Sequence, residues 1–192
     1  VGISTQGKRQ QWQQARGLLD EARRSDLEPD TIPYNCVISA CEKGQQWAQG
    51  LRSLAELRRR CLRFDTISCS ASISACEKGA QWQRAEELLG ELIRSGVERE
   101  GIACNAAISA CAKGGHWQRA VQLLAELLES DIRSSAIAHN AAISACGRGE
   151  QWQHALALLV ELQPRGLETT IVSHNAAISA CEKGRRLERA PR

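Results

Sequence analysis

Apolar residues in this chain recur at helical spacing, and the whole pattern repeats every 35 residues. Within residues 101–135 the first apolar stripe follows the offsets i, i+3, i+4 and i+7, which place side chains on one face of an α-helix. The members of this stripe are Cys104, Ala107, Ile108 and Cys111. Asn105 and Ser109 begin a small, polar stripe on the opposite side. We therefore expect a helix from about Ile102 to Lys113 that packs through one face only.

A second helical pattern follows the first within each period. In residues 101–135 it runs from about Trp117 to Leu128. Its apolar residues are Trp117, Ala120, Leu123, Leu124 and Leu127. No segment shows sustained alternation of apolar and polar residues, so we expect no strands.

Glycine separates the two helical patterns of each period. One column holds Gly44, Gly79, Gly114, Gly149 and Gly184, and Gly115 follows it once. We expect a glycine in this column to break the first helix and to close it in the left-handed conformation. Pro164 is expected to end its own helix early.

A fixed period of this length is typical of stacked-repeat solenoids. We expect a single array over residues 1–192, with a partial repeat at 1–30, full repeats at 31–65, 66–100, 101–135 and 136–170, and a partial repeat at 171–192. Two helices per period predict an all-α, right-handed superhelical solenoid of antiparallel helix pairs. The first helices are expected to line its inner surface, although the reverse assignment stays open. Because the chain starts within a repeat and has no methionine, we expect an excerpt of a longer protein.

Composition and spacing exclude several classes of protein. The net charge is +3, with 25 basic and 22 acidic residues interleaved, so charge alone does not name a nucleic acid as partner. No apolar run approaches the roughly 20 residues of a membrane span. The sequence offers neither CxxC or HxxxH spacing for zinc nor a recurring nucleophile and base. We therefore expect no membrane, metal, cofactor or small-molecule substrate, and a segment that is not an enzyme.

Nine cysteines could suggest a disulfide scaffold, but five of them occupy one column of the apolar stripe. Cys69 and Cys76 are seven residues apart on one predicted helix, which separates them by about 10 Å. A disulfide needs Cα atoms within about 7 Å, so this pair cannot be bridged within its helix. The cysteines are therefore expected to be structural thiols in a reducing compartment.

Most repeats open the first helix with YN or a similar xN pair and continue with a small apolar run and KG, and most carry LL-x-EL in the second helix. In these residues the chain resembles the pentatricopeptide repeat family, and its NAAISACEKG segment resembles the form abundant in some algal and alveolate proteins. The tetratricopeptide repeat has a period of about 34 and a W-x2-LG-x2-Y pattern that is absent here. The resemblance implies single-stranded RNA as the partner, with one base read per repeat by two or three side chains.

The resemblance also assigns residues to base reading: the Asn or Ser one turn into the first helix, and the last residue of the repeat. These pairs are Asn35 with Asp65, Ser70 with Glu100, Asn105 with Ser135, and Asn140 with Thr170, followed by Asn175 without a partner. By the family's rules the first pair resembles a uridine reader and the third a cytidine reader, while the fourth leans to a pyrimidine and the second weakly to a purine. An apolar residue at the helix start is expected to clamp the base, here Ile32, Ile67, Ile102, Ile137 and Val172.

A basic residue ends each first helix, in the column Lys43, Lys78, Lys113, Arg148 and Lys183. Contact with RNA phosphate and complementation of the helix dipole are equally good interpretations of this column. The Asn column has a structural alternative as well, a hydrogen bond at the helix start. Four Asn and one Ser in register favour a ligand groove over that alternative.

Three functions follow, and they stay open at this point. The resemblance favours sequence-selective binding of single-stranded RNA in support of organellar RNA processing, stability, editing or translation. The second is a helical-repeat scaffold for protein partners. The third is the RNA-positioning segment of a larger protein with a separate effector domain. The resemblance also implies a mitochondrial or chloroplast location, with any targeting peptide outside this chain.

Overall fold

A computed structural model of the chain describes residues 2–24, 31–60, 65–95, 101–129, 136–162 and 170–188. The regular elements in these ranges are all helices, and the predicted all-α solenoid of helix pairs is confirmed. The helices are α1 (Gly2–Arg24), α2 (Thr31–Lys43), α3 (Trp47–Arg59), α4 (Thr66–Lys78), α5 (Trp82–Arg94), α6 (Gly101–Lys113), α7 (Trp117–Glu129), α8 (Ala136–Arg148), α9 (Trp152–Leu162) and α10 (Ile171–Glu188). Helices α6 and α7 match the predicted bounds to within one residue at each end.

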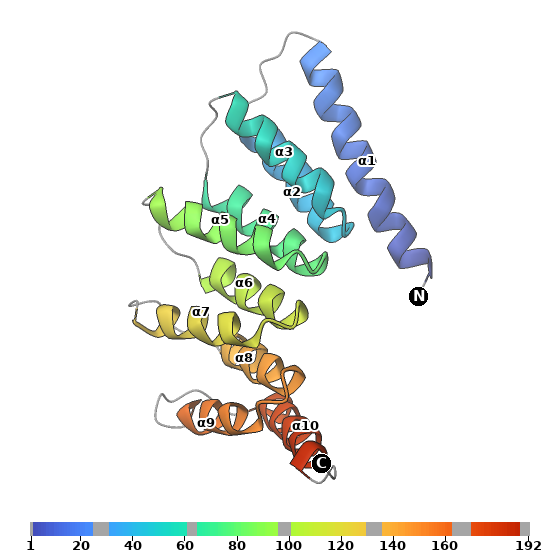
Figure 1. Cartoon of the computed structure of the whole chain (residues 1–192). Coiled ribbons are helices and arrows are strands. Elements are labelled where there is room, and N and C mark those ends of the chain that lie inside the picture. The colour runs from blue at the N-terminus through green and yellow to red at the C-terminus, as the bar shows by residue number, and fades with distance from the viewer. Residues whose placement is uncertain are drawn as a thin grey trace. The chain divides into compact units, whose positions relative to one another are not determined.

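The first of two compact units, residues 1–99, contains α1 to α5. Each first helix contacts its own second helix, α2 with α3 and α4 with α5, and α2 also contacts α4 (Figure 1). Helix α1 packs against α2 and so takes the place of the second helix of a preceding repeat. It begins ten residues before Trp12, whereas the other second helices begin at their tryptophan.

The second unit, residues 100–192, repeats this arrangement with α6 to α10. Helix α6 contacts α7 and α8, and α8 contacts α9 and α10. Helix α9 spans Trp152–Leu162, and Pro164, which was predicted to end this helix, lies outside the described residues. The described part of neither unit includes a helix long and apolar enough to cross a membrane.

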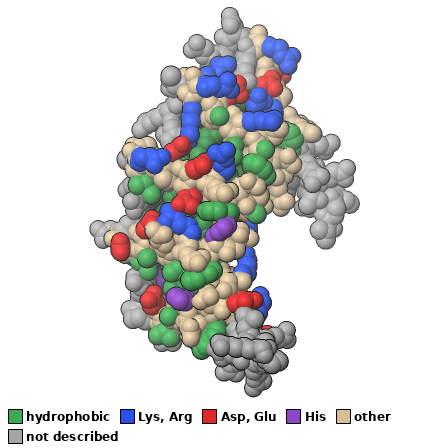
Figure 2. Space-filling view, in the orientation of Figure 1, with side chains coloured by type: hydrophobic (Ala, Val, Ile, Leu, Met, Phe, Trp, Pro, Cys, Tyr) green, Lys and Arg blue, Asp and Glu red, His purple; other side chains and the backbone are tan. Residues whose placement is uncertain are grey.

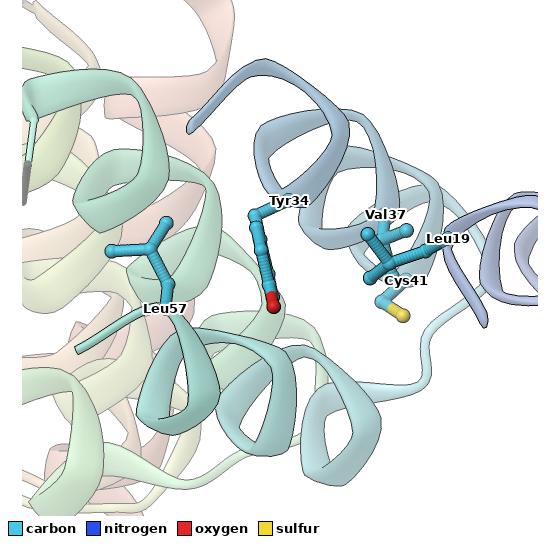
Figure 3. Packing of buried hydrophobic residues seen from close by; sticks show 5 residues of the cluster. All are labelled: Leu19, Tyr34, Val37, Cys41 and Leu57. Atoms are coloured by element: carbon cyan, nitrogen blue, oxygen red, sulfur yellow. The ribbon is translucent and has the colours of Figure 1, made fainter. Parts of the chain in front are cut away.

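The predicted apolar stripes form the core of each unit. The four stripe residues of α6, Cys104, Ala107, Ile108 and Cys111, are all buried, and so are Ala120, Leu123, Leu124 and Leu127 of α7. At the start of the chain, Leu19, Tyr34, Val37, Cys41 and Leu57 make one cluster from three helices (Figure 3). Fully burying one Leu or Ile stabilises the fold by about 1.5–3 kcal/mol. The described cysteines are all free thiols, so the core is held by packing.

The turn between the two helices is a Schellman motif in which the left-handed residue follows the glycine column. In the first full repeat Gln46 N–H donates to Cys41 C=O at 2.8 Å, and Gln45 has φ 57°. The equivalent residues Ala80, Gly115 and Glu150 have φ of 54°, 81° and 61°. The prediction of a left-handed glycine is therefore wrong for Gly44, Gly79, Gly114 and Gly149, and Gly79 has φ −87°. It holds at Gly115, the second glycine of its turn.

Gly184 does not end its helix, contrary to the prediction, because α10 continues to Glu188. In the other repeats a tryptophan follows three residues after this glycine and starts a second helix, but Leu187 stands there instead. Helix α10 contacts α9, the second helix of the preceding repeat, but within the described residues it has no second helix of its own repeat. Ile178 is consequently 60% exposed, while Ile38, Ile73, Ile108 and Ile143 in the same column are fully buried.

Candidate nucleic-acid interface

The first helices expose a regular column of aliphatic side chains. This column is 60–67% exposed, whereas Ile38, Ile73, Ile108 and Ile143, which form a later column of the same helices, are fully buried. Its members are Ile32, Ile67, Ile102, Ile137 and Val172, the residues predicted to clamp a base. A single exposed aliphatic side chain is ordinary on a protein surface. Exposure of an aliphatic side chain at the same position of successive repeats instead indicates a surface that binds a partner. Val160 on α9 is similarly exposed but belongs to no column.

In the first unit this column borders a hollow of about 470 Å³. Ile32, Asn35 and Lys43 of α2 line it together with Ile67 of α4. The hollow therefore brings together one residue of each predicted role: two clamps, a reader and a basic residue. Its apolar sides can hold a flat ring, while the amide and the ammonium group offer hydrogen-bond donors.

Asn35 and Asp65, a predicted reader pair 30 residues apart, are joined directly. The Asn35 Nδ2 group donates to Asp65 Oδ2 at 2.9 Å. Asp65 is also the N-cap of α4, since its Oδ1 accepts the Ser68 backbone N–H at 2.8 Å and the Ser68 hydroxyl at 2.7 Å. Burial raises the pKa of Asp65, but the hydrogen bonds from Ser68 and Asn35 outweigh burial and hold its pKa below the usual value. The carboxylate is thus ionised and fixed in position at neutral pH.

Asn140 and Thr170 are joined in the same way in the second unit. The Asn140 Nδ2 group donates to Thr170 Oγ1 at 3.3 Å. Thr170 caps α10 as Asp65 caps α4, because its Oγ1 accepts the Ser173 backbone N–H at 3.3 Å. The Ser173 hydroxyl in turn donates to Asn140 Oδ1. Two of the four predicted pairs are therefore physical contacts.

The other predicted readers are placed less completely. Glu100 and Ser135 lie outside the described residues, so the pairs of Ser70 and Asn105 are not defined. Ser70 is only 7% exposed, Asn105 is half-buried, and Asn175 is exposed. The capping role proposed as the alternative for the Asn column belongs to the last residue of the repeat instead, at Asp65 and Thr170.

Two residues of the basic column, Lys78 and Arg148, contact the preceding first helix, whereas the sequence suggested either RNA phosphate or the dipole of their own helix. Lys78 Nζ lies 2.8 Å from Glu42 Oε1 and 3.4 Å from Glu42 C=O, and Arg148 Nη1 donates to Ala112 C=O at 2.6 Å. Each side chain thus reaches the C-terminal end of the preceding first helix, where a cation complements the partial negative charge. Lys43 instead lines the hollow, and Lys183 is exposed. Figure 2 shows Lys, Arg, Asp and Glu interspersed on one face, as the mild net charge indicates.

Ser68 and Ser173 contact the reader pairs and were missed by sequence reasoning. Both are the third residue of a first helix and both are fully buried. The signal was present as D-x-x-S at Asp65 and T-x-x-S at Thr170, the spacing at which a capping residue meets the third residue of its helix. Without the capping role, these serines look like ordinary small core residues.

Comparison with known proteins agrees with this geometry. A family profile described as "Pentatricopeptide repeat domain" matches residues 87–149, and one described as "PPR repeat" matches residues 137–166. Among curated proteins, none matches the chain.

Solved structures match over nearly the whole chain. The pentatricopeptide repeat protein PPR10 in complex with an 18-nt psaJ RNA element superposes with a TM-score of 0.74 and 26% identity, covering 95% of this chain and 27% of PPR10. A second structure, of PPR10 from maize, gives a TM-score of 0.67 and 22% identity, covering 91% of this chain and 25% of PPR10. The PPR domain of Arabidopsis thaliana protein-only RNase P 1, in complex with tRNA, gives 0.76 and 12% identity, covering 94% of each chain. The last two likenesses show the fold alone.

These matches define the chain as a solenoid of paired helices. The 35-residue period, the matched profiles and the similarity to PPR10 together show that it belongs to the pentatricopeptide repeat family. The chain spans about a quarter of the length of PPR10.

Proposed function

We propose that this chain binds single-stranded RNA, with each repeat addressing one base. The observation that carries the proposal is the hollow on α2 and α4, where Ile32 and Ile67 flank Asn35 and Lys43. A base inserted between the two aliphatic side chains would meet the Asn35 amide at its edge, and the phosphate beside it would meet Lys43. The same exposed column continues at Ile102, Ile137 and Val172, which supports a repeated mode of binding.

The similarity to PPR10, whose structure was solved in complex with an 18-nt psaJ RNA element, supports RNA as the partner. We take the pairs Asn35 with Asp65 and Asn140 with Thr170 as readers because each is a hydrogen-bonded unit, and because Asn35 lines the same hollow as Ile32 and Ile67. Ser70 with Glu100 and Asn105 with Ser135 are proposed as readers by register alone. Membership of the family favours an organellar transcript as the target, in processing, stability, editing or translation. We propose binding and not catalysis as the role of this segment.

Fluorescence anisotropy with short labelled RNAs tests the proposal. The probe carries the core uridine, purine, cytidine and pyrimidine, and the controls are a scrambled RNA and the same sequence as single-stranded DNA. Four complete repeats address about four bases, so affinity is expected to be modest and to fall as salt rises from about 50 to 200 mM. No binding of any RNA at low salt would refute the proposal.

A matched pair of variants separates the column from general surface effects. Ile67→Ser removes a clamp that is 60% exposed, and Val160→Ser removes an aliphatic side chain that is 67% exposed on α9. We expect Ile67→Ser to weaken RNA binding by roughly fivefold, from the loss of about 1 kcal/mol of apolar contact. Val160→Ser should leave affinity unchanged. Equal effects of the two substitutions would argue against the column as the binding surface.

A further inference from the structure

A buried serine hydroxyl lies behind each of the two defined reader pairs. Ser68 and Ser173 are the third residues of α4 and α10, and both are fully buried. Each belongs to the repeat that follows the Asn of its reader pair. A buried hydroxyl must find hydrogen-bond partners, and in both cases those partners are the readers themselves.

At Asn140 the serine holds the amide by its oxygen. The Ser173 hydroxyl donates to Asn140 Oδ1, and its oxygen lies 3.0 Å from Thr170 Oγ1. On the other side of the amide, Asn140 Nδ2 donates to Thr170 Oγ1. Both ends of the amide are therefore engaged, and its orientation is determined by Ser173 together with Thr170.

At Asn35 the serine acts through the carboxylate. The Ser68 hydroxyl donates to Asp65 Oδ1, and Asn35 Nδ2 donates to the other carboxylate oxygen, Oδ2. Asn35 Oδ1 is buried and has no hydrogen-bond partner among the residues that the structure describes. The hydroxyl thus fixes Asp65, and Asp65 fixes the N–H side of Asn35.

The repeat of Asn105 lacks this hydroxyl. The third residue of the next first helix is Ala138, which is buried and whose methyl side chain carries no hydroxyl. Asn105 Oδ1 is buried without a hydrogen-bond partner in the described part of the chain. This is the counterpart of the oxygen that Ser173 satisfies at Asn140, so in the described residues the serine contact is present at Asn140 and absent at Asn105.

We propose that the third residue of each first helix is a positioning residue that determines how selectively the preceding repeat reads its base. This inference rests on the RNA-binding function proposed above. An amide held by its oxygen presents only N–H donors and selects base edges that carry an acceptor. An amide free to rotate by about 180° can present either its oxygen or its nitrogen, and so accepts more bases. Serine at this position makes the preceding repeat selective, and alanine makes it permissive.

Two reciprocal substitutions test the inference. Ser173→Ala removes the hydroxyl behind Asn140, and Ala138→Ser supplies one behind Asn105. Affinities are measured for four RNAs that differ only in the base addressed by repeat 136–170 or by repeat 101–135. We expect Ser173→Ala to reduce the ratio between the best and the worst base by roughly three- to tenfold, and Ala138→Ser to increase it by a similar factor. Each effect should be confined to its own repeat.

Ser72→Ala is the matched control, because Ser72 is a buried serine whose hydroxyl donates to the Ser68 backbone carbonyl at 2.7 Å and to no reader. A purely structural role for Ser173 would weaken binding of all four RNAs alike and leave the ratio unchanged. Unchanged ratios in both variants, with RNA still bound, would overturn the inference and leave the proposed function intact. Absence of RNA binding by the wild-type chain would overturn both. If Ser173→Ala does not fold, Ala138→Ser alone decides.

Discussion

The indole ring of Trp47 lies where a side chain on Gly79 would have to be. A Cβ atom placed on Gly79 would come within 2.3 Å of Trp47 Cδ1, and one on Gly149 within 2.2 Å of Trp117 Cδ1. In these two places the glycine serves the contact between successive repeats, because the tryptophan that starts a second helix covers the glycine that ends the next first helix. The Gly and the Trp of the repeated KG-x-x-W pattern thus contact different neighbours: the Gly contacts the Trp of the preceding repeat, and the Trp contacts the Gly of the following repeat.

Gly79→Ala is accordingly expected to destabilise the chain by about 1–3 kcal/mol, because a rigid ring must move to admit the methyl group. Urea unfolding followed by circular dichroism measures this loss. Gly90→Ala on α5 is the control, since its Cβ would meet only Arg94 Nη1 at 3.6 Å. In that open helical position alanine should stabilise by about 0.5–1 kcal/mol. Equal stabilities of the two variants would contradict the Trp47 contact.

The residue after the glycine column has the left-handed backbone conformation, so at this position glycine should stabilise the chain and alanine should destabilise it. Ala80 has φ 54°, a conformation that costs an L-residue about 1–2 kcal/mol. Ala80→Gly is expected to stabilise by about 1 kcal/mol, after the entropy cost of glycine is subtracted. Gly115→Ala should destabilise by a similar amount, through conformation alone, because its Cβ would meet no atom within 4 Å. Thermal unfolding of both variants checks the pair, and changes of the same sign would refute the assignment.

Asp65 should make the stability of the chain depend on acid pH. Its pKa is lower in the folded chain than the value of about 3.9 expected when unfolded. The stabilisation is therefore complete above the unfolded pKa and is lost as pH falls through the folded pKa. Asp65→Asn keeps a capping side chain without the titration. The difference in unfolding free energy between wild type and Asp65→Asn should be constant from about pH 5 to 7. Below about pH 4 the wild type should lose stability relative to Asp65→Asn. A difference independent of pH would exclude this role.

The sequence predicts the helices of this fold well, because the apolar stripes of α6 and α7 have one register that buries them. It misplaces the left-handed turn residue by one position, since glycine preference suggested Gly79 while packing against Trp47 is what requires that glycine. The exposed isoleucine column could be located from the sequence, because each of its members is the second residue of a repeat. Helical periodicity does not reveal the contacts of Ser68 and Ser173, because these depend on how individual side chains meet. Ser173, for example, contacts Asn140, which is 33 residues away in the sequence. Only the capping spacing pointed to them.

The cysteines should divide sharply by reactivity. Burial raises the pKa of Cys69 to about 12 and those of Cys41, Cys76 and Cys146 to about 11, from a usual value of 9.0. Cys36 is exposed. Because the thiolate is the reactive form, the loss of thiolate alone should slow the four buried thiols about a hundredfold or more at pH 8. Maleimide labelling followed by peptide mass spectrometry is expected to modify Cys36 first, and labelling of Cys69 at the same rate would contradict the packed core.

Lys43 and Lys78 occupy the same column but should contribute differently to RNA binding. Lys43 lines the hollow with Asn35, whereas Lys78 is paired with Glu42. Under the proposed function, Lys43→Ala should lower the slope of log affinity against log salt by about 0.7, the value for one phosphate contact on a single strand. Lys78→Ala should change the slope less, since this ammonium group must first leave its carboxylate. Affinities measured across a potassium chloride series test this difference. Glu42→Gln removes the carboxylate that pairs with Lys78, so it should make the salt slope steeper than that of the wild-type chain. Identical slopes for Lys43→Ala and Lys78→Ala would show that the ion pair does not restrain Lys78.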